Sequence, residues 1–107
     1  MITTVVLTHN SASTLKAALA SVAFSHEIII VDDESSDDTL QIAREYNARI
    51  ISRPLGDDYA GARNAGLAHA RSDWVFFLDS DEVVTADLAG ELQAASLNVS
   101  EVAGYYV

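Results

Sequence analysis

Short apolar runs alternate with segments of helical periodicity along the whole chain. The runs at 2–8, 27–31, 49–52 and 74–78 have strand length and contain many β-branched or aromatic residues. Between them, apolar residues recur every three or four positions, as they do on a helix that packs one face against a sheet. This alternation predicts an α/β fold in which a mainly parallel sheet is flanked by helices. A last apolar segment, 102–107, is expected to add a further strand.

One of the expected helices, over about 59–70, has an unusual inner stripe. Its members are small with one exception: Ala62, Ala65, Gly66, His69 and Ala70. A helix with small residues on its inner face is expected to pack unusually close to the sheet. The helix expected before 27 has larger apolar residues than this inner stripe. Thr39 is expected to begin the helix after it, and Thr85 to cap the last one.

The composition indicates one folded domain, 1–107, and excludes several classes of function. Half of the 107 residues are hydrophobic, which suffices for a single core. Sixteen Asp and Glu against six Lys and Arg give a net charge of −10, which disfavours nucleic-acid binding and anionic lipid surfaces. The lack of cysteine excludes disulfides and thiol nucleophiles. With no membrane-length apolar run and no signal-peptide pattern at 1–10, we expect a soluble, cytoplasmic protein.

Three polar clusters directly follow expected strands. They are Thr-His-Asn at 8–10, Asp-Asp-Glu at 32–34 and Asp-Ser-Asp at 79–81. Ligands bind at the carboxyl ends of the strands in open α/β sheets. Strand-to-helix turns favour Asp, Asn and Ser in any case, so one such cluster alone says little. Two acidic clusters on one sheet edge, however, repel each other unless a cation lies between them, so the clusters together predict a ligand site with a cation.

The carboxylates of Asp79 and Asp81 alternate on a tight turn after an apolar strand. Hard oxygen ligands of this kind suit Mg²⁺ or Mn²⁺ carrying a diphosphate. A calcium-binding EF-hand is excluded by the spacing. Counting from Asp79 puts Val84 where the loop needs glycine and Gly90 where it needs glutamate.

Four segments of the chain occur in an order that is itself informative. They are VVLTHN at 5–10, VDDESSDDT at 31–39, GARNAG at 61–66 and WVFFLDSDE at 74–82. Together they resemble the family 2 nucleotide-sugar-dependent glycosyltransferases, and the first and last are most similar to the branch with bacterial lipopolysaccharide-core glucosyltransferases. The resemblance implies a GT-A, Rossmann-like fold. It also implies metal-dependent transfer of a sugar from a UDP-sugar to a sugar or lipid-linked acceptor, in cell-envelope polysaccharide synthesis.

The resemblance further implies roles for residues on the nucleotide side of the site. Thr8 and Asn10 match the strand segment that lines the base pocket. His9, between them, either stacks on the base or caps or packs against the following helix. Asp33 matches the acid that accepts a hydrogen bond from uracil, and Asp32 beside it shapes the turn.

On the diphosphate side, the resemblance assigns residues from a helix and from the last acidic turn. Arg63 and Asn64 match the helix segment that faces the nucleotide, where Arg63 neutralises part of the phosphate charge. Asp79 matches the acid near the ribose, with Ser80 next to it. Asp81 matches the direct ligand of the metal, and Asp79 is expected to assist it in holding Mg²⁺ or Mn²⁺.

The catalytic base is not identified among these residues. Family members are longer than this chain, and their acceptor-side half carries the base, whereas only 26 residues follow Asp81. We therefore expect the donor-binding part of a longer enzyme, inactive alone, with its base beyond Val107 and a peripheral membrane association only through missing regions. Two alternatives remain open: a non-catalytic nucleotide-binding module, and a nucleotidyltransferase-like domain. The latter would need a glycine-rich phosphate loop, and 8–15 contains no glycine.

Overall fold

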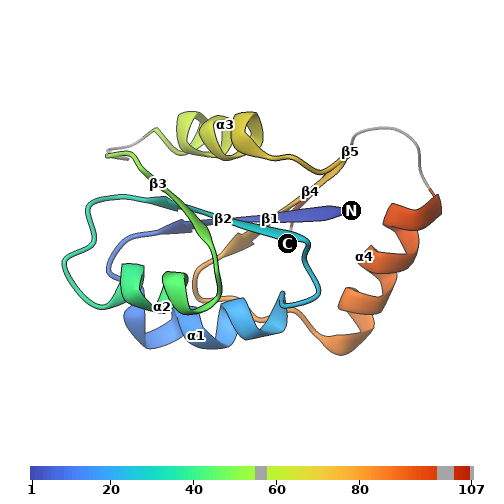
Figure 1. The fold of residues 1–107 in the computed structure, drawn as a ribbon, viewed down its shortest axis with the longest axis horizontal. Helices are drawn as coiled ribbons and strands as arrows, with labels where there is room; N and C mark the ends of the chain where they lie inside the picture. Colours follow the sequence, from blue (N-terminus) through green and yellow to red (C-terminus); the bar gives the residue numbers. More distant parts are fainter. Residues whose placement is uncertain (55–57, 99–102, 107) are drawn as a thin grey trace.

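The fold is centred on a parallel β-sheet (Figure 1). The computed structural model describes residues 1–54, 58–98 and 103–106, and within these ranges it contains five strands and four helices. In chain order they are β1 (Ile2–Thr8), α1 (Ala12–Ser21), β2 (Glu27–Asp32), α2 (Thr39–Glu45), β3 (Arg49–Ser52), α3 (Tyr59–His69), β4 (Trp74–Asp79), α4 (Ala86–Asn98) and β5 (Ala103–Tyr106). The predicted alternation of strands and helices is therefore confirmed. Val102 and Val107, the ends of the last expected strand, lie outside the described residues.

The strands lie in the order β3-β2-β1-β4-β5, and every pair is parallel. From β1 the chain moves outward to β3, then returns to the other side of β1 for β4 and β5. The order thus reverses between β1 and β4, which is where ligands bind in sheets of this type. The register places Leu7 opposite Asp79, Thr8 opposite Asp32, and Asp32 opposite Ser52. All the predicted polar clusters therefore meet at one edge of the sheet.

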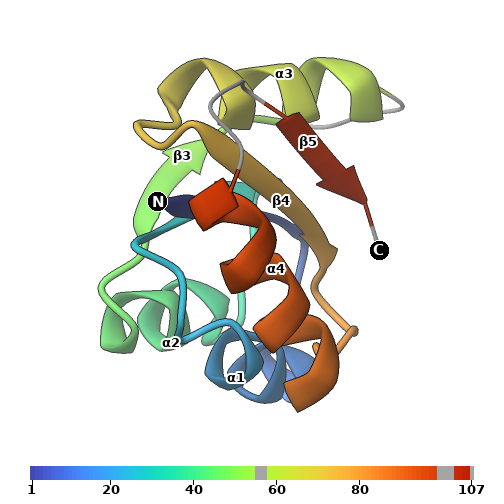
Figure 2. The same ribbon diagram turned by 90° about the vertical axis from the view of Figure 1, so that its right-hand side faces the viewer.

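Helices cover both faces of the sheet: α1, α2 and α4 lie on one face and α3 on the other (Figures 1 and 2). Because the central strands are buried on both sides, alternate residues enter two separate cores. Val6, Ile30 and Phe76 pack with Leu15 and Leu92 on the first face. Val5, Ile29, Val31, Val75 and Phe77 pack with Ala62 of α3 on the second. None of the helices in the described ranges is both long and apolar enough to cross a membrane.

Helix α3 packs closely on the sheet, as its small residues predicted. Ala62 and Gly66 are buried, and a Cβ atom built on Gly66 would lie 2.5 Å from Cγ1 of Val5. The expected inner position of His69 is wrong. His69 is the last residue of the helix and is exposed, and its Nδ1 contacts the carbonyl oxygen of Ala65 at 2.8 Å.

Asp37 joins the beginnings of two helices. Its Oδ2 accepts a hydrogen bond from the backbone N–H of Ala12 in α1 at 3.1 Å, and its Oδ1 accepts one from the N–H of Thr39 in α2 at 3.0 Å. A further hydrogen bond from the Thr39 hydroxyl holds the pKa of Asp37 below its ordinary value. The loops that follow β1 and β2 are thereby fastened to each other.

At the start of α4, the expected cap is confirmed, since Oγ1 of Thr85 accepts a hydrogen bond from the N–H of Leu88 at 3.2 Å.

Candidate functional site

A hollow of about 490 Å³ lies where β1, β2 and β4 end. It is lined by Leu7, Thr8, His9, Ser11, Val31, Asp33, Arg53, Tyr59, Arg63, Asp79, Ser80 and Asp81. Most of the residues predicted from the sequence are in this set, although they come from four separate segments of the chain. The parallel register brings them together, because it puts the carboxyl ends of neighbouring strands side by side.

Asp32 is buried beneath the hollow and does not line it. Its Oδ1 accepts hydrogen bonds from the hydroxyls of Thr8 and Ser35, each at 2.6 Å. Its Oδ2 accepts from the backbone N–H of Ser35 at 3.0 Å. Both oxygens of this buried carboxylate are thus hydrogen-bonded within the protein. Through these hydrogen bonds, Asp32 shapes the turn that presents Asp33.

Asp33 and His9 form the next layer outward. The backbone N–H of Asp33 donates to the carbonyl of Thr8 at 2.8 Å, which extends the ladder between β1 and β2. Nδ1 of His9 lies 2.5 Å from the Asp33 carbonyl oxygen and 3.7 Å from its carboxylate. The hydrogen bond to the carbonyl, together with nearby carboxylates, raises the pKa of His9 above its ordinary value. Because Ser11 occupies the N-cap position of α1, the helix-capping alternative for His9 is wrong.

The turn after β4 presents Asp79 and Asp81 to solvent. It is closed by a backbone hydrogen bond from Glu82 N–H to the Asp79 carbonyl at 3.0 Å. Oε1 of Glu82 also accepts from the N–H of Asp79 at 3.1 Å. Ser80 accepts a hydrogen bond from the hydroxyl of Ser11 at 3.0 Å, which ties this turn to the loop after β1. The point at which the strand order reverses is thus bridged by side chains.

The donor set at this turn fits a hard divalent cation. Within the described ranges, no three His, Asp or Glu side chains gather into a ready metal cage. Mg²⁺ is commonly held by only one or two carboxylates, with substrate phosphates and water as its other ligands. The exposed pair Asp79 and Asp81 meets that requirement, since both line the same hollow.

Two further predicted residues, Asn10 and Asn64, do not line the hollow either. Asn10 has a left-handed backbone (φ 46°), and its Oδ1 accepts from the N–H of Ser36 at 2.7 Å. Its side chain therefore fastens the loop after β1 to the loop after β2. Asn64 is exposed on α3.

Arg53 and Tyr59 line the hollow but were missed in the sequence analysis. Arg53 follows β3 directly, in the same way that Asp33 follows β2, so the argument from strand ends would have found it. Tyr59 begins α3 four residues before Arg63, which puts both residues on one face of the helix. A search for helical partners of Arg63 would have identified it.

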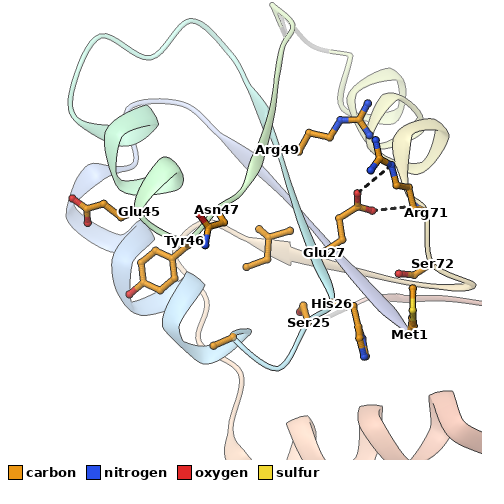
Figure 3. A pocket seen from close by; sticks show the side chains of 12 residues that line it. Met1, Ser25, His26, Glu27, Glu45, Tyr46, Asn47, Arg49, Arg71 and Ser72 are labelled. Atoms are coloured by element: carbon orange, nitrogen blue, oxygen red, sulfur yellow. Dashed lines mark hydrogen bonds and ion pairs between the residues drawn. The ribbon is translucent and has the colours of Figure 1, made fainter.

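A larger hollow, about 690 Å³, lies at the opposite, amino-terminal edge of the sheet (Figure 3). Several of its charged side chains are bonded to neighbouring residues. Oε1 of Glu27 accepts from the Thr3 hydroxyl and from the N–H of Arg71, both at 2.9 Å. Arg49 donates to the carbonyl of His69 at 3.3 Å. These bonds hold the starts of strands and the loop before β4 together, whereas the residues that the sequence predicted for ligand binding line the smaller hollow.

The fold and the site together define the class of protein. A parallel sheet whose order reverses beside β1, with paired carboxylates after β4, is the arrangement of GT-A glycosyltransferases, and solved structures of such enzymes match it. The sequence model of the family described as Glycosyl transferase family 2 matches residues 3–100, so the chain belongs to this family.

Individual relatives agree with this assignment. The chain is 35% identical over 94 residues to an uncharacterized glycosyltransferase of Rickettsia prowazekii (strain Madrid E), covering 86% of this chain and 32% of the relative. The structure of S. aureus TarS 1–349 matches with a TM-score of 0.74 at 28% identity, covering 87% of this chain and 31% of TarS 1–349. TarS 1–349 has also been solved in complex with UDP-GlcNAc.

A third relative is glucosyl-3-phosphoglycerate synthase from Mycobacterium tuberculosis, solved with Mn²⁺, UDP and glucosyl-3-phosphoglycerate. It matches with a TM-score of 0.64 at 27% identity, covering 75% of this chain and 33% of the synthase. The chain therefore spans about a third of the length of each of these proteins.

Proposed function

We propose that this chain binds a UDP-sugar and forms the donor-binding part of a glycosyltransferase. The observation that carries the proposal is the single hollow in which the Asp79–Asp81 turn lies with Asp33 and Arg63, where the strand order reverses. Binding of UDP-GlcNAc by TarS, and of UDP with Mn²⁺ by the mycobacterial synthase, supports it.

Different residues of the hollow bind different parts of the UDP-sugar. Asp33 accepts a hydrogen bond from the uracil N3–H, Thr8 and His9 line the base side, and Asp79 with Ser80 lies near the ribose. Arg63 faces the phosphates as a fixed cation. Asp81, with Asp79, would hold Mg²⁺ or Mn²⁺, which when bound supplies positive charge to the diphosphate and to the departing nucleotide.

Asn10 and Asp32 act one step further from the donor in this proposal, because both hold the loop that carries Asp33. Asn64 borders the nucleotide side of α3. The acceptor is a sugar or a lipid-linked sugar of cell-envelope polysaccharide, in keeping with the resemblance to lipopolysaccharide-core glucosyltransferases. We place this chemistry in the cytoplasm, with the base on an acceptor-side region of a longer protein.

Ligand-induced stabilisation tests the metal-dependent part of this proposal. UDP is expected to raise the melting temperature clearly with Mn²⁺ and much less with EDTA, because a ligand that binds only the folded state stabilises it. Asp81→Asn should abolish the metal-dependent part of the shift. Asp87→Asn, an exposed acid in the first turn of α4, is the matched control and should preserve it. Equal shifts with Mn²⁺ and with EDTA would remove the metal from the proposal.

A further inference from the structure

Arg53 lies beside Asp33 at the carboxyl edge of the sheet. Its backbone N–H donates to the carbonyl of Asp32 at 2.8 Å, one step beyond the last register pair, Asp32 opposite Ser52. Asp33 and Arg53 are therefore the first residues after β2 and β3. These two strands are neighbours in the sheet (Figure 1). Both residues line the smaller hollow, where the ends of β2 and β3 lie across β1 from the Asp79–Asp81 turn that follows β4.

The side chain of Arg53 is held in a defined position. Its Nη2 donates to Oδ2 of Asp58 at 3.1 Å, and Oδ1 of Asp58 accepts from the N–H of Gly61 at the start of α3 at 2.9 Å. A Cβ atom on Gly61 would lie 2.1 Å from Oδ2 of Asp58 and 2.5 Å from Nη2 of Arg53. The absence of a side chain at Gly61 is thus what leaves room for this ion pair.

The ion pair with Asp58 does not use all the donors of the guanidinium group. Arginine has five N–H donors and no acceptor. Nε of Arg53 is shielded from solvent and meets no acceptor among the described residues, while the side chain as a whole is 40% exposed. The hollow is therefore lined both by a positioned, donor-only group and by Asp33, which as a carboxylate is acceptor-only.

We propose that Arg53 is a specificity-determining residue that, paired with Asp33, selects uracil over cytosine; this rests on the proposed binding of a UDP-sugar. Uracil offers an N3–H donor next to a C4 carbonyl acceptor, which complements a carboxylate beside a guanidinium. Cytosine presents the reverse pattern, an N3 lone pair next to a C4 amino group. The carboxylate would then face a lone pair, and the guanidinium would face a donor. Mismatches that leave polar groups unpaired give strong discrimination.

Comparison of UDP and CDP isolates the base, because the ribose, the diphosphate and the metal are the same in both. Dissociation constants for the two nucleotides with Mn²⁺ are measured by calorimetry on the wild-type protein and on Arg53→Gln. The wild type should prefer UDP by at least about tenfold. Arg53→Gln should weaken UDP and not CDP, so that the preference falls by about tenfold. Arg49→Gln, at the other end of the sheet, is the matched control and should change neither constant.

Further variants separate base recognition from other roles. Arg53→Lys keeps the charge but not the planar fork, and should give an intermediate preference. Equal weakening of UDP and CDP in Arg53→Gln, or loss of the preference in Arg63→Gln instead, would overturn the role of Arg53. If the wild type binds neither nucleotide, the proposed function itself fails along with this inference. Melting temperatures without ligand, measured for each variant, show whether a change in affinity comes from unfolding.

Discussion

Adjacent carboxylates at the end of β2 have different environments, although the sequence presents them as one acidic run. Asp32 is buried and accepts three hydrogen bonds, whereas Asp33 lines the hollow. Glu34 has a left-handed backbone (φ 48°), so the chain turns sharply after Asp33. The division of roles thus follows from the backbone path and from the donors on Thr8 and Ser35.

His9 is expected to titrate above its ordinary pKa of about 6.5, because its protonated ring donates to the Asp33 carbonyl. NMR titration of the ring measures this directly. Since the pKa is raised in the folded state, the contribution to stability is complete below the unfolded value and is lost as the pH rises through the folded value. His9→Gln should therefore lower the melting temperature more at about pH 5.5 than at about pH 9.

A variant of the neighbouring acid separates the two causes of this shift. Asp33→Asn removes the side-chain charge but keeps the backbone carbonyl, so the ring pKa should fall only part of the way. A wild-type midpoint at or below about 6.5 would contradict the hydrogen bond to the carbonyl.

At the level of single residues, the sequence predicted Thr8, Asp33, Arg63, Asp79 and Asp81 in one site, and the structure places all of them around one hollow. Their roles toward a ligand remain predictions. The sequence predicts which residues follow a strand, but it does not predict the direction in which their side chains point. For this reason Asn10, predicted to line the base pocket, is found bonded between the loops, and Arg53 was overlooked, whereas Asp32 does shape the turn as predicted.

Two helix glycines offer a matched test of how closely α3 packs. Gly66→Ala places a Cβ atom 2.5 Å from Cγ1 of Val5, a stiff side chain in the central strand, and should destabilise the protein by about 1–2 kcal/mol. Gly90→Ala in α4 meets nothing within 4 Å, and should stabilise it by about 0.5–1 kcal/mol through helix propensity. Chemical denaturation measures both. Equal effects of the same sign would show that α3 does not depend on a close approach.

At the level of elements, hydrophobic periodicity was sufficient to predict the strands and helices, because each buries an apolar face against the sheet. The tie made by Asp37 between α1 and α2 was not predictable in this way. It depends on Asp37 lying beside the start of α1 in the folded chain, although Asp37 and Ala12 are 25 residues apart in the sequence. The inner position expected for His69 was wrong for a related reason. Helical spacing in the sequence continues to Ala70, but the helix ends at His69, and only Ala62 and Gly66 of α3 are buried.

Across the whole molecule, charge is distributed unevenly with respect to the site. The chain carries only six Lys and Arg against sixteen acids, yet two of these cations, Arg53 and Arg63, line one hollow. The same hollow contains Asp33, Asp79 and Asp81. An anionic nucleotide approaching a protein of net charge −10 is repelled at long range, so local cations must provide the attraction. This is why a bound divalent metal and both arginines are expected to act together.

The 107-residue polypeptide is expected to bind its donor without transferring sugar. Transfer needs a base within hydrogen-bond reach of the acceptor hydroxyl. In the described part of the hollow, the acids are Asp33, Asp79 and Asp81, which the proposal assigns to uracil, ribose and metal. The nearby Glu82 is bonded to the N–H of Asp79.

Incubation with UDP-glucose, Mn²⁺ and a panel of sugar and lipid-linked acceptors should therefore give at most slow hydrolysis, followed as released UDP and as glycosylated product. A protein extended to the length of its relatives is the positive control, because it would add the surface that orients the acceptor, an effect worth several kcal/mol of barrier. Glu82→Gln is the informative variant: it should leave the slow hydrolysis unchanged. Steady transfer by the short chain at ~1 s⁻¹ or faster, abolished by Glu82→Gln, would instead make Glu82 the base and this chain a complete catalyst.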